Sequence, residues 1–320
     1  MYCGKHGILE EREKLTASRL TRFRSNLKKR MVAISASCNW EKGRRDRVAW
    51  SSSLDQSSIY GSAAGRPIGI ISAKRLHAKP QQAELKVIEE LCIAPKDYQL
   101  HASANIQRAR AGYARGLLLG DDPGNGKRLP AMIECVRLRR QADRFSAVVV
   151  PASCIDQWSE EFRKFFKPNT VKVRVIRDAT IPPQTIVRSD VVIVSYGFMM
   201  YQYRKQIAYL RQVGKWEKKR EGETPTRPML SILSEVFLDG VHGLTVVFDE
   251  CNAIKNRNSL THAAAVYFWS HFEACLLLTG SPIDNTWDDP FGLYQVMEGH
   301  QIRNFQQFRK VFGVPDDKYK

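Results

Sequence analysis

Short apolar runs that alternate with helix-like stretches from residue 81 onward are the feature that most constrains the fold of this chain. The strand-like runs occupy residues 116–119, 147–150, 171–176, 191–195, 245–248 and 274–278. Helical periodicity lies between several of them, at residues 129–140 and 155–166. Apolar strands that alternate with helices form parallel sheets covered on both faces. The sequence therefore predicts an α/β fold, with a parallel sheet between two layers of helices.

The two ends of this pattern differ from its centre. Residues 1–80 are rich in Arg, Lys and Ser with little apolar periodicity, which predicts a basic, largely irregular extension. An amphipathic helix is expected at residues 81–91, where the domain of residues 81–320 begins. The pattern weakens again at about 201–243, which predicts a surface insertion formed by a long loop.

The charge of the chain favours anionic partners. Lysine and arginine total 50 residues against 33 aspartates and glutamates, a formal net charge of +17. Such an excess attracts nucleic acid or acidic proteins, and a merely solvated basic surface is the alternative. Because no apolar run approaches the roughly 18–20 residues that cross a bilayer, we expect no membrane partner. The 7 cysteines form no Cys-x-x-Cys pair, so neither zinc nor a disulfide framework is expected.

The sequence GDDPGNGKR at 120–128 has the features of a phosphate-binding loop, because it follows an apolar run and precedes a helix. Its glycines let backbone N–H groups approach phosphate, and Lys127 would contact the β and γ phosphates. Arg128 stands where such loops carry the Ser or Thr that holds Mg²⁺, and a guanidinium group cannot ligate a cation. A glycine-rich turn without a ligand is the alternative.

Two carboxylates, Asp249 and Glu250, end the apolar run at 245–248. The carboxyl ends of parallel strands face the ligand crevice of such a sheet. Phosphate-loop enzymes place acidic groups there, so Asp249 would hold Mg²⁺ and Glu250 would orient or deprotonate a water molecule. A strand that simply runs into a polar loop is the alternative.

Six segments, in this order, resemble motifs of the Swi/Snf-type ATPases, a branch of helicase superfamily two. They are YQ at 98–99, GDDPGNGKR at 120–128, VVVPASCIDQW at 148–158, VVIVSY at 191–196, DECNAIKN at 249–256 and LTGSPIDN at 278–285. The resemblance covers about residues 96–312. It implies the first, RecA-like lobe of a two-lobe, DNA-dependent ATPase.

The resemblance also assigns roles to individual residues. Gln99 resembles the glutamine that reads adenine, and Asp249 with Glu250 resembles the catalytic acidic pair. The nucleotide-binding loop would include Asp122, Gly124, Asn125, Gly126, Lys127 and Arg128. Contacts to the DNA backbone would come from Pro151, Ser153, Ser195, Tyr196, Thr279 and Ser281.

The chain departs from the family pattern at Arg128, and at Asn252, where the family has His. The family's second lobe supplies arginines for catalysis, and we expect no such lobe before Lys320. We therefore expect ATP binding without efficient hydrolysis, and a Mg²⁺ requirement weakened by Arg128.

The resemblance implies ATP and double-stranded DNA or chromatin as partners, with a second-lobe protein as a further one, and residence in the nucleus. Three alternatives remain open for the function. The chain is an ATPase lobe whose partner lobe is separate, a degenerate module that holds DNA or a remodelling complex, or a truncated copy.

Overall fold

The computed structural model describes residues 87–111, 115–139, 144–219, 223–233, 243–281, 289–297 and 304–312. All of them belong to one compact unit, Gly69–Lys320. The expected basic extension, residues 1–80, and the first half of the expected helix, residues 81–86, lie outside the described residues.

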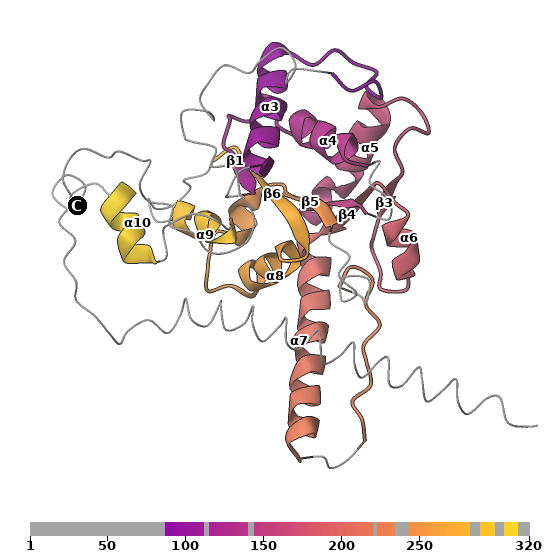
Figure 1. Cartoon of the computed structure of the whole chain (residues 1–320), viewed down its shortest axis with the longest axis vertical. Coiled ribbons are helices and arrows are strands. Elements are labelled where there is room, and N and C mark those ends of the chain that lie inside the picture. The colour runs from indigo at the N-terminus through magenta and orange to yellow at the C-terminus, as the bar shows by residue number, and fades with distance from the viewer. Residues whose placement is uncertain are drawn as a thin grey trace, which may run out of the picture. The chain divides into compact units, whose positions relative to one another are not determined.

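A parallel sheet of six strands forms the centre of the described structure (Figure 1). The strands are β1 (Gly116–Leu119), β2 (Ser146–Val150), β3 (Val173–Val175), β4 (Val191–Ser195), β5 (Gly243–Phe248) and β6 (Phe272–Leu278). Their order across the sheet is β1-β6-β5-β2-β4-β3, and all neighbours run parallel. The predicted α/β fold is thereby confirmed, with β3 shorter than the sequence indicated.

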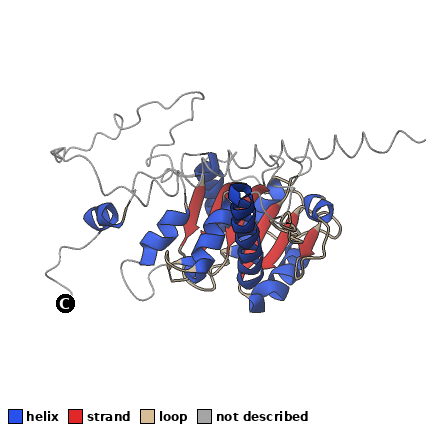
Figure 2. Ribbon diagram, turned by 90° about the horizontal axis from the view of Figure 1, so that it is seen from below, coloured by secondary structure: helices blue, strands red, loops and turns tan. Residues whose placement is uncertain are grey.

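Helices cover both faces of the sheet, as Figure 2 shows. One layer consists of α3 (Asp97–Ala111), α4 (Arg128–Arg137) and α5 (Ile155–Phe165), and the other contains α6 (Pro183–Val187), α7 (Tyr196–Lys219), α8 (Leu260–Trp269) and α9 (Asp289–Val296). The helix α10 (Phe305–Phe312) follows, and two 3-10 turns, η1 (Ala152–Cys154) and η3 (Cys251–Ile254), come directly after strands β2 and β5.

Each face of the sheet carries its own hydrophobic core. Along β2, Val148 and Val150 pack in one cluster with Trp158 of α5. Val149 packs in the other cluster with Phe268 of α8. This alternation follows from the strand period of two, so the fully apolar runs found in the sequence are strands buried on both sides.

The helix α7 corrects the prediction of a long loop from residue 201. Residues up to Lys219 continue one helix of 24 residues that runs past the sheet (Figure 1). The apolar pattern weakens there because Gln202 and Gln206 occupy buried positions of the helix. Gln202 Oε1 accepts hydrogen bonds from the backbone N–H groups of residues 231–233, at 3.0–3.3 Å, and so anchors the returning chain. No described helix combines the length and the apolarity that a membrane crossing requires.

The described part of the expected helix at 81–91 is also not helical. Instead, Leu91 forms an isolated antiparallel bridge with Phe166, which follows α5. Cys92 N donates to Phe165 O at 2.8 Å and Lys167 N donates to Glu90 O at 2.7 Å. Pairing with a distant segment thus overrides the local helical pattern.

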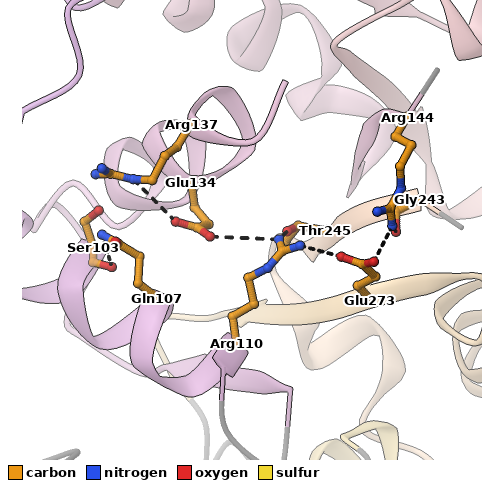
Figure 3. A network of polar contacts seen from close by, with 9 residues as sticks. All are labelled: Ser103, Gln107, Arg110, Glu134, Arg137, Arg144, Gly243, Thr245 and Glu273. Atoms are coloured by element: carbon orange, nitrogen blue, oxygen red, sulfur yellow. Dashed lines mark hydrogen bonds and ion pairs between the residues drawn. The ribbon is translucent and has the colours of Figure 1, made fainter. Parts of the chain in front are cut away.

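A polar network connects α3 and α4 to the amino ends of β5 and β6 (Figure 3). Arg110 of α3 lies at its centre and donates to Thr245 Oγ1 at 2.8 Å and to Glu273 Oε2 at 2.7 Å. Its guanidinium group also lies 3.9 Å from the carboxylate of Glu134, a buried residue of α4. Burial raises the pKa of Glu134, although Arg110 and Arg137 act in the opposite direction. The network lies at the opposite strand ends from the residues considered next.

Candidate functional site

The carboxyl ends of β1, β5 and β6 bring three of the predicted motifs together. These strands are neighbours in the order β1-β6-β5, so the segments that follow them lie at one edge of the sheet. The turn after β6 reaches the glycine loop after β1, since a Cβ atom added at Gly280 would lie 2.8 Å from Pro123 Cγ. The predicted assembly of loop, acidic pair and turn is therefore present in the fold.

The glycine loop has a backbone that only glycine adopts without strain at two positions. Gly124 has φ +88° and Gly126 has φ +67°, both in the left-handed region. Lys127 Nζ donates to the carbonyl oxygens of Asp121 at 2.6 Å and Asp122 at 3.0 Å. The helix α4 then begins without a side-chain cap on its first N–H groups. A glycine-rich turn that leads into a helix, with a lysine at its end, fits a phosphate group.

Gln99 lies beside this loop. Its Oε1 accepts a hydrogen bond from Lys96 N at 3.0 Å, and its Nε2 donates to Gly126 O at 3.4 Å. A Cβ atom added at Gly126 would lie 2.4 Å from Gln99 Nε2. The glutamine predicted to read a base is therefore positioned by the loop that is predicted to bind phosphate.

Arg128 contacts the acidic strand end directly. Its Nε donates to Asp249 Oδ2 at 3.1 Å and its Nη1 to Glu161 Oε1 at 2.9 Å. The same Oδ2 accepts a hydrogen bond from Trp158 Nε1 at 2.7 Å, and the guanidinium carbon lies 5.7 Å from the Trp158 ring centroid. Burial alone would lower the pKa of Arg128, but the carboxylates of Asp249 and Glu161 outweigh it and raise that pKa.

These contacts do not fit a magnesium ion at Asp249. One of its carboxylate oxygens already binds a guanidinium cation and an indole N–H group. A second cation at the same oxygen would be repelled, and residue 128 supplies no hydroxyl ligand. The expected weakening of the Mg²⁺ site by Arg128 agrees with this geometry, whereas the expectation that Asp249 holds the metal does not.

Glu161 and Trp158 are site residues that the sequence did not identify as such. They lie three residues apart on α5, a spacing that places two side chains on the same face of a helix. A positive charge at position 128 needs a counter-charge when it is partly buried. The cation at residue 128 thus predicts a carboxylate nearby, but the sequence does not indicate which carboxylate that is.

Glu250 differs from its neighbour in exposure and in backbone conformation. Asp249 is buried, whereas Glu250 is exposed. The backbone of Glu250 is left-handed, with φ 47° and ψ 54°, which costs free energy for a residue other than glycine. The turn directs the two adjacent carboxylates to different surroundings, so Glu250 is far more accessible to a water molecule than Asp249.

Asn252 connects the turns after β5 and β6. Its Nδ2 donates to Ser281 Oγ at 3.3 Å, and Ser281 N donates to Thr279 Oγ1 at 3.1 Å. The Oδ1 of Asn252 is buried and has no hydrogen-bond partner among the described residues. The Asn252 amide therefore connects the segments that follow β5 and β6, and it occupies the position at which the resembled family has a histidine.

Two of the residues predicted to contact DNA are buried. Tyr196 stacks on Phe248, and its hydroxyl donates to Asp249 O at 2.8 Å. Thr279 is 1% exposed, and its hydroxyl accepts the N–H of Ser281. Both side chains therefore support the turns beneath the surface, and a contact to DNA at these two positions, which stays a prediction, would come from the backbone.

The other predicted DNA contacts lie at or near the surface. Ser153 and Ser281 are exposed, and Pro151 and Ser195 are partly buried. Ser195 Oγ accepts a hydrogen bond from Phe198 N at 3.0 Å at the start of α7. Ser195 is the last residue of β4 and the others follow β2 and β6, so the same edge of the sheet carries them and the glycine loop.

Comparison with known proteins agrees with these observations. The model of the SNF2-related domain matches residues 44–319 of the chain. An uncharacterized ATP-dependent helicase of Schizosaccharomyces pombe is 22% identical over 216 residues, 66% of this chain and 20% of that protein. The DNA repair protein RAD5 of Saccharomyces cerevisiae is 25% identical over 54% of this chain and 14% of its own length. The chain thus spans a fifth or less of these relatives.

A solved structure shares the fold. The SWI2/SNF2 ATPase core of Sulfolobus solfataricus, in complex with double-stranded DNA, superposes with a TM-score of 0.51 at 20% identity. The match covers 72% of this chain and 41% of that one. At this identity the likeness establishes the fold of a RecA-like lobe, and the chemistry must be argued from the residues present.

Proposed function

The chain belongs to the SNF2-related domain family, and from that premise we propose that it is a first ATPase lobe that binds ATP without requiring Mg²⁺. The observation that carries this proposal is the ion pair between Arg128 and Asp249, which lies beside a glycine loop with its lysine intact. Hydrolysis by this lobe alone would be slow, because the family's catalytic arginines come from a second lobe.

Binding of the triphosphate follows from the loop. Lys127 contacts only backbone carbonyls of its own loop among the described residues, and phosphate oxygens would replace them. Backbone N–H groups of the glycine loop, from Gly124 to Lys127, would donate to the same oxygens. Gln99, next to Gly126, would contact the adenine edge.

Arg128 would take over part of the role of the metal. A guanidinium group carries a fixed positive charge and presents several N–H donors to phosphate oxygens. It already pairs with Asp249 and Glu161, so neither of these two carboxylates is left for a metal to neutralise, whereas the exposed Glu250 lies outside this pairing. ATP affinity should therefore depend on Lys127 and only weakly on Mg²⁺.

Isothermal titration of ATP, once with Mg²⁺ and once with EDTA, tests this proposal. We expect dissociation constants that agree within about threefold, and about tenfold or more loss of affinity for Lys127→Ala, since it removes a charge-assisted phosphate contact. The variant Lys164→Ala, at an exposed position of α5 outside the loop, should bind as the wild type does. Tight binding that disappears with EDTA would refute the proposal.

We also propose that this lobe binds duplex DNA through its strand-end loops. The support is the exposure of Ser153 and Ser281 at the edge that carries the nucleotide loop, together with the net charge of +17. The archaeal relative of the same fold is described in complex with double-stranded DNA, and RAD5 is described as a DNA repair protein. From the resemblance of the chain to the Swi/Snf-type ATPases we also propose that it acts in the nucleus, on chromatin.

Fluorescence anisotropy with a labelled duplex measures this binding. Because counterion release dominates contacts to phosphates, affinity should fall steeply between roughly 50 and 200 mM salt. Ser153→Glu places a negative charge among the proposed backbone contacts and should weaken binding, whereas Ser159→Glu on α5 is the matched control. Affinity that is insensitive to salt would contradict the proposal.

A further inference from the structure

The helix α7 carries a row of exposed basic residues, most of them in its second half. The helix contains six lysines and arginines against a single acidic residue, Glu217. Among its described side chains, the exposed basic ones are Arg204, Arg211, Lys215 and Lys218. The inner side of the helix is buried at Gln202, Gln206 and Val213.

Helical geometry places these four cations on one side. With about 100° per residue, Arg211, Lys215 and Lys218 deviate from the direction of Arg204 by only about 20–40°. Glu217 points about 140° away from that direction by the same arithmetic. The row extends for roughly 21 Å along the axis, at 1.5 Å per residue.

This row is separate from the strand-end loops. A strand of five residues such as β4 spans roughly 17 Å, whereas the 24 residues of α7 span roughly 36 Å. Arg211, Lys215 and Lys218 therefore lie roughly 22–33 Å along the helix from Tyr196, which follows β4. In Figure 1 the same half of α7 projects away from the sheet, with the returning chain beside it.

The chemistry of this face indicates the class of partner. Between Arg204 and Lys218 the other exposed residues among the described side chains of the helix are Ala208 and Gln212. The exposed Tyr201 lies one turn before this row, so the row itself offers no large apolar anchor. Protein interfaces depend on aromatic or aliphatic anchors, and helices that lie on membranes need an apolar face directed outward. Regularly spaced cations without apolar residues instead suit the phosphates of a nucleic acid backbone.

We infer that the exposed basic face of α7, made of Arg204, Arg211, Lys215 and Lys218, is a second contact surface for the phosphate backbone of duplex nucleic acid. It extends the proposed function, since it adds a contact remote from the nucleotide edge to those of the strand-end loops. Because these contacts go to phosphates, they contribute affinity without sequence preference.

The test compares two triple variants of the full chain by fluorescence anisotropy with a duplex of about three helical turns. The first, Arg211→Gln with Lys215→Gln and Lys218→Gln, keeps good helix formers on α7. The matched control, Arg163→Gln with Lys164→Gln and Lys167→Gln, removes the same charge from exposed positions at the end of α5. Circular dichroism checks that both variants keep their helical content.

We expect the α7 variant to lose about tenfold or more in affinity and to reduce the slope of log K against log salt by about 2–3. The control should change both quantities much less. Equal losses in the two variants would mean that only net charge matters and would overturn the inference, as would an unchanged α7 variant. A wild-type chain that binds polyglutamate in preference to the duplex would also overturn it.

The proposed nucleotide function is judged independently of this outcome. Titration of ATP in the presence of EDTA should give the same affinity for the α7 variant and for the wild type. If ATP binds but the α7 face proves inert, only the further inference fails. If the α7 variant loses DNA affinity while no chain binds ATP, only the proposed nucleotide function fails.

Discussion

Arg128 and Asp249 form a direct ion pair, with Arg128 Nε 3.1 Å from Asp249 Oδ2, across the site where the glycine loop meets the acidic strand end. Trp158 donates to the same oxygen, and Glu161 binds the other side of the guanidinium group. A guanidinium group of the protein thereby pairs with both carboxylates. A nucleotide that binds there would meet the fixed guanidinium cation of Arg128 instead of an open site for a metal ion.

The variant Arg128→Thr should make ATP binding dependent on Mg²⁺. It removes the cation from Asp249 and supplies the hydroxyl ligand that phosphate loops of this kind normally contain. We expect Mg²⁺ to raise the ATP affinity of the variant by about tenfold or more, against about threefold or less for the wild type, as measured by isothermal titration.

Arg128→Val is the matched control, because it removes the cation without adding the hydroxyl. It should gain less response to Mg²⁺ than Arg128→Thr. If neither variant responds to the metal, the ion pair is not what weakens the metal site. An ATPase assay with DNA on Arg128→Thr then separates a lobe capable of hydrolysis from a binding module.

Gly126→Ala should impair the discrimination of adenine more than Gly124→Ala does. Both glycines have positive φ, so an alanine costs about 1–2 kcal/mol of strain at either position. At Gly126 the new Cβ atom would also lie 2.4 Å from Gln99 Nε2 and displace that amide, whereas Gly124 has open space around it. Titrations with ATP and GTP should show a reduced preference for ATP in Gly126→Ala alone. Equal behaviour of the two variants would argue against a role of Gln99 in base recognition.

The sheet was predictable because its central strands are buried on both faces. Residues of β2 and most of β4 have almost no exposure, and continuous apolar runs encode that directly. The helix α7 was not predictable in the same way. Its buried Gln202 is satisfied by backbone groups some 29–31 residues further along the chain, and no local pattern contains that partner.

The site was predictable at the positions where strand ends determine it. Lys127, Asp249 and Glu250 follow apolar strands, and parallel strands bring their carboxyl ends to one edge. What Arg128 contacts depends instead on the packing of α4 and α5 on the same face of the sheet, which places Glu161 within 2.9 Å of it. The sequence shows that Arg128 departs from the phosphate-loop motif, but it does not show that Glu161 compensates its charge.

Arg110→Met should destabilise the fold strongly. It leaves Glu134, which is 1% exposed at its side chain, without its contact to Arg110, and it removes a partner of Glu273 (Figure 3). Loss of one partner from such a buried network costs about 2–4 kcal/mol in the free energy of unfolding. Arg177→Met is the control, since its ion pair with Asp156 is mostly exposed and should contribute less than about 0.5 kcal/mol. Urea denaturation measures both, and comparable losses would contradict the assignment of the network as structural.

Trp158→Phe should cost more stability than Trp269→Phe, although both indoles are buried and the substitution is the same. Trp158 Nε1 donates to the carboxylate of Asp249 at 2.7 Å, whereas Trp269 Nε1 has no hydrogen-bond partner among the described residues. Hydrogen bonds to charged groups contribute about 1.5–3 kcal/mol, so we expect a difference of that size in the free energy of unfolding. The first variant also leaves Arg128 as the sole side-chain donor to Asp249 among the described residues, and Arg128→Thr should therefore cost more in that background than in the wild type. Urea denaturation of the single and double variants measures this coupling, and strictly additive losses would show that the two donors stabilise Asp249 independently.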